Sequence, residues 1–355
     1  MLPYTQINGI ATIRDPQRGF AAGKSGTSWK YALVLACLFL TGCIDPAPPP
    51  PTHIGIVQFG DSRTPQVDGF IDGMRQLGYS EPDTVRYTIL NAHNDRKLLE
   101  GFVRKLLAVN VDMIASTGGL ETDAIKKVME QTTKPVPVVV LYVNAIVERG
   151  VVKTRRDPGW NVTGVDNLNA QLSGKRIELF HQLLPSARRF LILYTERIDP
   201  SRIGLAEARA MAAKLGLTID ARDVTTRDDI ARTMRALRRG DVDAMLMVPN
   251  APIDNALRDI ILPEAHRLGL PIMGFSRPMA ESGTVAAYGA SFYDMGNQAA
   301  RLAVKVLQGV PPRNIPFETP KQYFYTINRD VLEALGLNLT DTVTSAVDEI
   351  IGEST

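Results

Sequence analysis

Short aliphatic and β-branched runs alternate with longer amphipathic stretches along the chain from Thr52 onward. The first run, residues 53–59, is followed by a polar turn and then by apolar residues at helical spacing up to Gly78, the expected C-cap. Strands that alternate with helices in this way are typical of βα units in a parallel sheet, so the pattern predicts an α/β fold. The residues expected on the buried face of this first helix are Phe70, Met74 and Leu77.

Two series of such units follow one another, and a chain of this length usually exceeds the size of one hydrophobic core. The first series has further strands predicted over residues 85–91, 111–116 and 137–143, with helices that begin near Asn94 and Gly119. After Val165, the second series has strands predicted over residues 190–194, 217–223, 244–248 and 271–275, with helices between them. We therefore expect two doubly wound parallel-sheet lobes, and a ligand site in the cleft between them, beyond the carboxyl ends of the strands.

The last part of the chain closes the pattern. After residues 285–289 it has a strong helix over residues 292–307, then a strand-like segment over residues 323–327 and a short helix that ends at Leu335. Residues 339–355 are polar with few aromatic side chains. We expect them to form a flexible tail, because such a segment has little with which to pack onto the domain.

The N-terminal region differs from the rest in charge and hydropathy. Its first 30 residues carry four basic side chains against one acid, Asp15, and an apolar run then covers residues 31–40. This is the order of a secretory signal peptide, and the run is too short for a membrane-spanning helix of about 20 apolar residues. We expect residues 1–42 to be a cleaved signal peptide. Because the leader is unusually long, the true start could lie downstream of Met1.

The apolar run ends in Leu40-Thr41-Gly42-Cys43, which resembles the lipobox of bacterial lipoproteins. That resemblance implies a diacylglycerol on the Cys43 thiol and a membrane anchor in the periplasm or at the cell surface. The alternative is an ordinary signal peptide that contains a cysteine, and Cys37 is a weaker candidate. Five prolines lie within residues 46–51 and favour extended polyproline geometry, so residues 43–51 should form the lipidated cysteine and a semi-rigid spacer.

Composition excludes several classes of function. The two cysteines, Cys37 and Cys43, precede the domain that begins at Thr52, so that domain has no thiol for a disulfide, a thiolate metal site or redox chemistry. The net charge is +2, with acids and bases interspersed, which offers no electrostatic footprint for nucleic acid. Basic pairs such as Arg155-Arg156 are interpreted as solvated faces.

No catalytic motif occurs in the sequence. A Gly-x-Gly-x-x-Gly loop, a Walker phosphate loop and a Gly-x-Ser-x-Gly elbow are all missing, and the four histidines stand apart from one another. Carboxylate pairs such as Asp228-Asp229 lie where they favour the positive end of a helix. We expect neither an enzyme nor a bound metal or cofactor.

Polar and aromatic residues follow the predicted strands, immediately before each helix. The segment Ser116-Thr117-Gly118-Gly119 would suit a carboxylate or another anion at a helix N-terminus, although helix capping alone explains it equally well. Three of the residues at strand ends are aromatic and could stack on a planar ligand or belong to the lobe cores. The candidate ligand contacts are Gln58, Phe59, Asp61, Ser116, Thr117, Gly118, Tyr142, Asn144, Asn250, Phe275 and Ser276.

The order of several segments resembles the periplasmic substrate-binding lipoproteins of ABC importers related to the tryptophan- and tyrosine-binding type. The resemblance covers nearly all of residues 52–338. It rests on residues 69–79 (GFIDGMRQLGY), residues 161–165 (NVTGV), residues 178–180 (ELF) with Leu184-Pro185, residues 288–309 with Tyr288-Gly289, Asp294-Met295-Gly296 and Leu307-Gln308-Gly309, residues 318–321 (ETPK), Ile327-Asn328, and residues 334–337 (ALGL).

This resemblance implies a type I binding-protein fold, in which three crossings join two lobes that close on a ligand as a hinged trap. The crossings would fall near residues 164–167, 288–291 and 317–319. Lobe 1 would then comprise residues 52–165 with 289–317, and lobe 2 residues 166–288 with 318–338. The family's ligand contacts fall on the strand-end residues named above and also on Asp166.

The sequence departs from the family at two strand ends. Members that bind amino acids commonly carry acids there, whereas this chain has Asn250-Ala251-Pro252 and Phe275-Ser276-Arg277. A buried ammonium needs a carboxylate partner, so an α-amino acid ligand is in doubt unless Asp254 or Asp166 replaces the missing acids.

Three functions remain open. The leading hypothesis is a monomeric solute-binding lipoprotein that delivers a small organic ligand to the transmembrane subunits of an ABC permease. The second is a ligand-sensing module of a signalling system on the same fold. The third, an extracytoplasmic α/β enzyme, lacks any recognisable pair of nucleophile and base.

Overall fold

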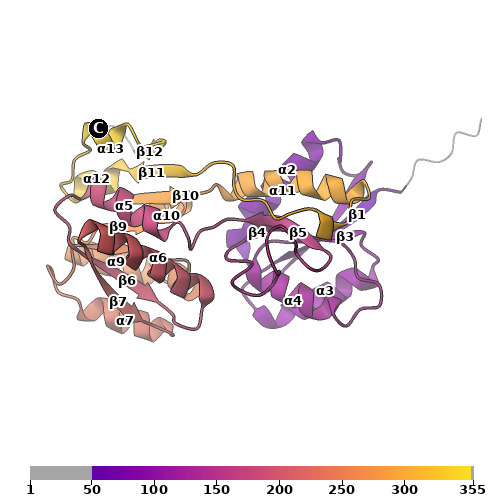
Figure 1. Ribbon diagram of the computed structural model, residues 1–355, viewed down its shortest axis with the longest axis horizontal. Helices are drawn as coiled ribbons and strands as arrows, with labels where there is room; N and C mark the ends of the chain where they lie inside the picture. The colour runs from indigo at the N-terminus through magenta and orange to yellow at the C-terminus, as the bar shows by residue number, and fades with distance from the viewer. Residues whose placement is uncertain (1–49, 353–355) are drawn as a thin grey trace, which may run out of the picture. The chain divides into compact units, whose positions relative to one another are not determined.

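The computed structural model describes residues 50–352, and Pro50–Thr355 forms a compact unit of its own. The predicted signal peptide, Cys43 and the spacer up to residue 49 lie outside the described residues. Within residues 50–352, no helix is long and apolar enough to cross a membrane. The elements belong to two parallel-stranded α/β lobes, so the predicted fold class is confirmed (Figure 1).

Lobe 1 is built on a five-stranded parallel sheet of order β2-β1-β3-β4-β5. Its strands are β1 (Thr52–Gln58), β2 (Val85–Asn91), β3 (Met113–Ser116), β4 (Val138–Val143) and β5 (Val162–Asp166). The fifth strand was not predicted, because Gly164 interrupts its short β-branched run. At that glycine a Cβ would lie 2.3 Å from the Val140 carbonyl oxygen, so the close approach of β4 and β5 requires it.

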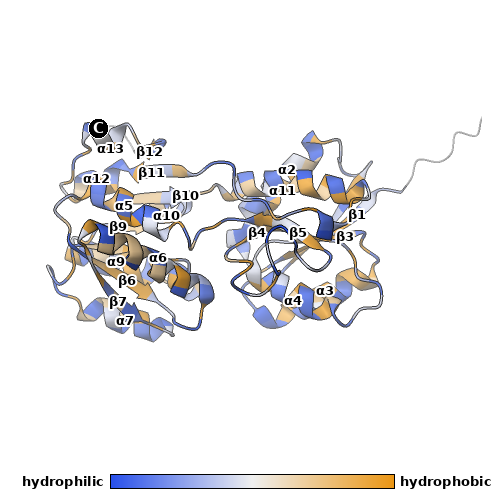
Figure 2. Ribbon diagram, in the orientation of Figure 1, coloured by the Kyte–Doolittle hydropathy of each residue, from blue (hydrophilic) through white to orange (hydrophobic). Residues whose placement is uncertain are grey.

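Helices cover both faces of this sheet. Helix α2 (Thr64–Gln76) and helix α11 (Phe292–Leu307) pack on the face that carries Ile54 and Ile56, and α3 (Leu99–Ala108) and α4 (Gly119–Met129) on the opposite face. Figure 1 shows α11 beside α2 although the two helices are far apart in the sequence. Hydrophobic and hydrophilic residues alternate along these helices in Figure 2, as one buried face requires. Short 3-10 turns are η1 (Asp61–Arg63), η2 (Arg96–Leu98) and η4 (Pro312–Asn314).

Lobe 2 is built on a seven-stranded sheet of order β12-β11-β10-β9-β8-β6-β7. All neighbouring strands run parallel except the antiparallel pair β10–β11. The strands are β6 (Arg189–Tyr194), β7 (Thr218–Asp223), β8 (Ala244–Leu246), β9 (Ile272–Gly274), β10 (Ala286–Gly289), β11 (Phe324–Asn328) and β12 (Glu349–Ile351).

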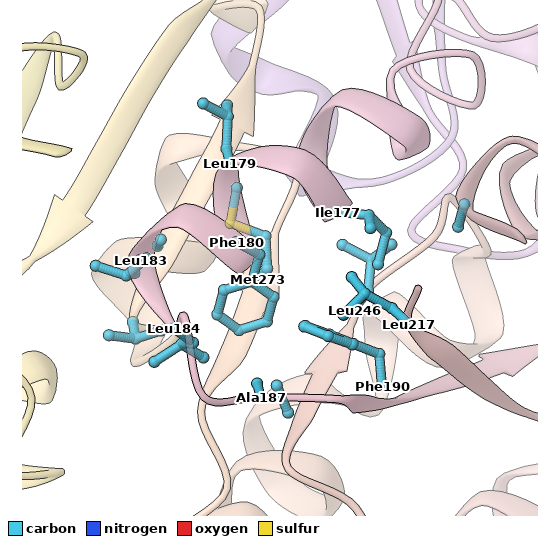
Figure 3. Packing of buried hydrophobic residues seen from close by; sticks show 14 of the residues in the cluster. Ile177, Leu179, Phe180, Leu183, Leu184, Ala187, Phe190, Leu217, Leu246 and Met273 are labelled. Carbon is cyan, nitrogen blue, oxygen red and sulfur yellow. The ribbon is translucent and has the colours of Figure 1, made fainter. Parts of the chain in front are cut away.

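The core of lobe 2 lies on both faces of its sheet. On one face, α5 (Ser173–Leu183) and α6 (Asp199–Leu215) cover the strands, and Figure 3 shows Phe180 of α5 near Phe190 of β6. The two rings meet edge to face with centroids 5.7 Å apart. The remaining helical segments of lobe 2 are α7 (Arg227–Ala236), α8 (Ala251–Asn255), the π-helical turn η3 (Leu257–Ile261), α9 (Leu262–Leu268), α10 (Arg277–Ser282), α12 (Arg329–Ala334) and α13 (Asp341–Thr344).

Three segments connect the two sheets. Residues 167–172 lead from β5 to α5, residues 290–291 from β10 to α11, and residues 315–323 from η4 to β11. The end of β5, from which the first segment leads, lies beside the third segment: the Asp166 N–H donates to the Glu318 carbonyl oxygen at 2.9 Å. We call these segments crossings 1, 2 and 3.

Two expectations from the sequence are wrong. Residues 341–351 are not a flexible tail, because they form α13 and β12, and β12 pairs in parallel with β11. Val343 and Val347 pack onto the lobe 2 core, and the free edge of β11 accepts the strand. Leu77 is 45% exposed instead of lying on the buried face of α2, because that helix ends at Gln76 and Leu77 is its C-cap.

Candidate functional site

The carboxyl end of β1 holds a turn built by Gln58. Its side-chain amide donates to the Gly60 carbonyl oxygen at 3.0 Å and lies 3.1 Å from the Thr64 hydroxyl. The next residue, Phe59, packs against the core below α3 and α4. Asp61 is exposed and accepts from the Asn91 amide at 2.7 Å. Gln58 and Phe59 therefore shape the wall of lobe 1, whereas Asp61 lies on its surface beside β2.

A buried carboxylate occupies the N-terminal turn of α4. Glu121 Oε1 accepts from the Phe59 N–H at 3.0 Å and from the Thr117 hydroxyl at 2.7 Å. The Ser116 hydroxyl bonds to the Gly118 carbonyl oxygen at 3.1 Å and lies 2.8 Å from the Thr122 hydroxyl. The segment predicted to receive an anion is thus already occupied by the protein's own Glu121, whose Oε2 is buried without a hydrogen-bond partner in residues 50–352.

Arg63 lies beside this carboxylate, although no pattern in the sequence indicated it as a site residue. Its Nε is 3.9 Å from Glu121 Oε1, and its guanidinium lies 5.3 Å from the centroid of the Tyr142 ring. Phe292 packs edge to face against the Tyr142 ring, with the ring centroids 5.2 Å apart. Burial raises the pKa of the Tyr142 hydroxyl, so this group is a neutral hydrogen-bonding partner at physiological pH. Arg63 begins α2 at its N-cap, a position that carried no sequence signal because arginine is not a capping residue.

Lobe 2 contributes an amide and a carboxylate from the carboxyl end of β8. The Asn250 side-chain nitrogen donates to the hydroxyls of Thr195 at 2.8 Å and Ser201 at 3.1 Å, and its Oδ1 is buried without a partner among the described residues. Burial raises the pKa of Asp254, one helical turn later, well above the ordinary carboxyl value, and the charge of Arg63 opposes this rise. The charge of Arg63 in lobe 1 thus acts on Asp254 in lobe 2, although no hydrogen bond or ion pair joins the two side chains within residues 50–352.

The remaining candidates lie at the crossings and at the end of β9. Asp166 is buried, with Oδ2 2.6 Å from Arg155 Nε, and burial raises its pKa although Arg155 opposes the rise. Asn144 Oδ1 accepts from the Ala170 N–H in crossing 1 at 3.2 Å. Phe275 is buried below the guanidinium of Arg176 at 5.6 Å, and the buried Ser276 precedes α10 as its N-cap. The candidate residues thus divide between the two lobes and the hinge.

A cavity of about 720 Å³ lies elsewhere in lobe 1. Its lining includes Met129 and Glu130 at the end of α4, and Trp160 and Asn161 immediately before β5. These residues lie at the amino edge of the sheet, opposite the strand ends described above. We therefore do not assign this cavity to the cleft site. In the part of the chain from Pro50 to Gly352, no group of three or more His, Cys, Asp or Glu side chains could hold a metal ion.

Comparison with known proteins places this arrangement in a family. The family described as ABC transporter substrate binding protein matches residues 53–351, which is most of the chain. The chain belongs to this family. The resemblance found in the sequence is thereby confirmed, and membership indicates a binding role outside the cytoplasm in place of an enzymatic one.

Individual relatives agree with this placement. The present chain is 27% identical over 290 residues to a tyrosine-binding protein from Clostridioides difficile (strain R20291), and the match covers 80% of this chain and 81% of the relative. A Streptococcus pneumonia ABC domain in complex with L-Trp shares the fold with a TM-score of 0.76 and 24% identity, over 85% of this chain and 100% of the other. A ligand-free, open substrate-binding protein from Clostridium difficile has a TM-score of 0.66 and 21% identity, over the same shares of the two chains.

The raised pKa of Asp254 predicts a pH-dependent difference in stability between the parent and an Asp254→Asn variant. Above about pH 4, the parent should be the less stable of the two. The native state holds the Asp254 proton more tightly than the unfolded chain does. Stability is therefore lost as the pH rises from the ordinary aspartate pKa of about 3.9 toward the native value. We expect Asp254→Asn to raise the melting temperature at neutral pH and to have no such effect near pH 3.5 to 4. The measurement is the melting temperature of the ligand-free 50–355 domain, parent and variant, at a series of pH values from about 3.5 to 7.

The matched control is Asp68→Asn, which makes the same substitution on the exposed side of α2. The difference in melting temperature between this control and the parent should be the same at every pH. If the difference for Asp254→Asn were also independent of pH, the Asp254 carboxyl group would not be desolvated.

Proposed function

We propose that the protein is the solute-binding lipoprotein of an ABC importer and that it captures an aromatic amino acid in the cleft between its lobes. It would be anchored through Cys43 outside the cytoplasm and would present the closed complex to the transmembrane subunits of a permease. The observation that carries this proposal is that Arg63 of lobe 1, beside the ring of Tyr142, and Asp254 of lobe 2 each hold a buried polar atom without a hydrogen-bond partner among the described residues.

These two charges match the two ends of an amino acid. The Arg63 guanidinium, whose buried Nε has no hydrogen-bond partner in the described residues, would receive the ligand carboxylate. Asp254, with a buried and unpartnered Oδ1, would receive the ligand ammonium, which would restore its ionised form. Asp254 would in this way replace the acids that the family commonly carries at the positions of Asn250 and Phe275.

Aromatic side chains support the choice of an aromatic ligand. Tyr142, at the edge of the lobe 1 core, and Phe292 form an edge-to-face pair, and Phe275 lies at the end of β9 in lobe 2. A planar ligand side chain between such walls gains both apolar burial and ring contacts. The relatives named for tyrosine and for bound L-Trp are consistent with this ligand class. Closure would follow because only the closed state brings both walls onto one ligand.

A thermal-shift assay of the 50–355 domain tests the proposal. L-tryptophan or L-tyrosine at 100 times its dissociation constant should stabilise the domain by about 2.7 kcal/mol, which raises the melting temperature by several degrees. Tryptamine, which lacks the carboxylate, and indole-3-propionate, which lacks the ammonium, should each produce a much smaller shift. A larger shift with either analogue than with both amino acids would contradict the roles of Arg63 and Asp254, and no shift with any amino acid would contradict the ligand class.

A further inference from the structure

Arg176 is a fully buried cation that the proposed ligand contacts do not use. It lies in α5, its side chain has no exposed surface, and it forms no ion pair with a carboxylate within residues 50–352. Burial lowers its pKa to about 9. An unpaired guanidinium is costly to remove from water, so its retention requires compensating hydrogen bonds.

Those hydrogen bonds go to the connections between the lobes. Arg176 Nη1 donates to the Asn169 carbonyl oxygen at 2.7 Å, and Nη2 donates to the side-chain oxygen of the same residue, in crossing 1. Arg176 Nε donates to the Tyr288 carbonyl oxygen at 2.7 Å, one residue before β10 ends and crossing 2 follows. One rigid planar group therefore holds crossing 1 against the strand that leads into crossing 2.

The segment held by Arg176 has a strained backbone. Leu168 adopts a φ of 54°, in the left-handed region that a leucine rarely occupies. Asn169 completes the turn by donating its N–H to Asn167 Oδ1 at 2.9 Å. Such a conformation persists only where neighbouring contacts impose it, and Arg176 supplies two of those contacts.

The same guanidinium also lies against the cleft wall. It is 5.6 Å from the centroid of the Phe275 ring, a geometry that favours cation–π attraction. The Tyr288 ring, next to the carbonyl that Arg176 binds, pairs with the Tyr323 ring of crossing 3 at 6.0 Å. Through these neighbours, Arg176 is linked to all three crossings and to one candidate ligand contact.

We propose that Arg176 is the positioning residue that couples the ligand wall at Phe275 to the hinge, by fixing crossings 1 and 2 relative to each other. This inference rests on the proposed function. A ligand that presses on the Phe275 ring acts on the same cation that holds Asn169 and Tyr288. The lobes are thereby limited to a narrow range of orientations before the ligand arrives.

The absence of cysteine after Cys43 allows a clean test by spin labelling of the 50–355 domain. Exposed residues for the two labels are Lys105 on α3 of lobe 1 and Lys214 on α6 of lobe 2, each replaced by cysteine. Pulsed electron paramagnetic resonance measures the distance between the labels, without ligand and with saturating L-tryptophan. The parent should give one narrow distribution without ligand and a shifted one with ligand.

Arg176→Met keeps an unbranched apolar stem and removes the guanidinium, and with it the charge and the donors. We expect a broadened distance distribution in the ligand-free variant. We also expect the affinity for L-tryptophan to fall about tenfold, as it would if only about a tenth of the molecules had the lobe orientation that binds the ligand. Arg176→Lys keeps the charge but cannot reach all three acceptors, so it should not rescue the narrow distribution. The control is Arg209→Met, on the exposed side of α6, which should match the parent.

A narrow ligand-free distribution and unchanged affinity in folded Arg176→Met would overturn the inference. If that variant does not fold, Asn169→Ala removes one acceptor and leaves Arg176 in place, and an unbroadened distribution there would overturn it equally. Failure of L-tryptophan to bind the parent would count against the proposed ligand alone, because the width of the ligand-free distribution still tests Arg176.

Discussion

Gly296→Ala should destabilise lobe 1 by about 1 to 2 kcal/mol. A Cβ at Gly296 of α11 would lie 2.0 Å from the Gln66 carbonyl oxygen and 2.9 Å from the Phe70 nitrogen of α2. Both atoms belong to a helical backbone and cannot rotate away, so the two helices must move apart. Overpacking of this kind typically costs about 1 to 3 kcal/mol, and the gain in helix propensity offsets only part of it. Urea unfolding of the 50–355 domain measures the change.

A second glycine provides the matched control. Gly101 lies within α3, and a Cβ there would meet no atom within 4 Å. Gly101→Ala should therefore stabilise the protein by about 0.5 to 1 kcal/mol, because alanine loses less conformational entropy in a helix. Gly69→Ala tests the same contact from α2, where a Cβ would lie 2.0 Å from the Tyr293 carbonyl oxygen. If Gly296→Ala and Gly101→Ala changed stability alike, α2 and α11 would not pack as closely as described.

The second large effect is expected at Arg63. Arg63→Met keeps an apolar stem over the Tyr142 ring but removes the cation that we propose binds the ligand carboxylate. Truncating one partner of a buried, hydrogen-bonded charge pair costs about 2 to 5 kcal/mol, so the affinity for L-tryptophan or L-tyrosine should fall at least about 30-fold. Isothermal titration calorimetry measures it. The same variant should also be less stable without ligand, since Glu121 loses its neighbouring cation.

Arg75→Met is the control for this substitution, because Arg75 lies in α2 with an exposed side chain paired only to Asp72 among the described ion pairs. It should bind as the parent does, since exposed pairs contribute little. An Arg63→Met protein that melts cooperatively and binds within threefold of the parent would remove Arg63 from the ligand site.

Much of the fold follows from local patterns. The predicted strands before β5, those from β6 to β9, and β11 lie within a few residues of the observed ones because β-branched runs bounded by turn residues identify buried strands. The short strands β5, β10 and β12 were not predicted. Each is specified by its neighbours: β5 by the close approach to β4 at Gly164, β10 by its pairing with β9 and β11, and β12 by the free edge of β11.

The candidate site was predictable only in outline. Strand ends in a parallel sheet indicate a ligand site, and Tyr142, Asn250 and Phe275 follow from that pattern. Arg63 and Arg176 do not, because a single arginine among other charged residues gives no pattern that distinguishes a buried cation from an exposed one. The same pattern predicts a ligand at Ser116 and Thr117, whereas Glu121 accepts from the Thr117 hydroxyl in the structure.

By itself, the sequence determined the α/β class, the order of its units and the family resemblance, because these depend on the local spacing of apolar, turn and capping residues. Only the tertiary structure decided which charges meet. Arg63 and Asp254 lie far apart in the sequence and in different lobes, and only folding brings the charge of Arg63 close enough to act on Asp254. Arg176 is compensated by backbone carbonyls, and a carbonyl is present at every residue. Such partners are chosen by packing and not by side-chain identity, so they leave no trace in the sequence.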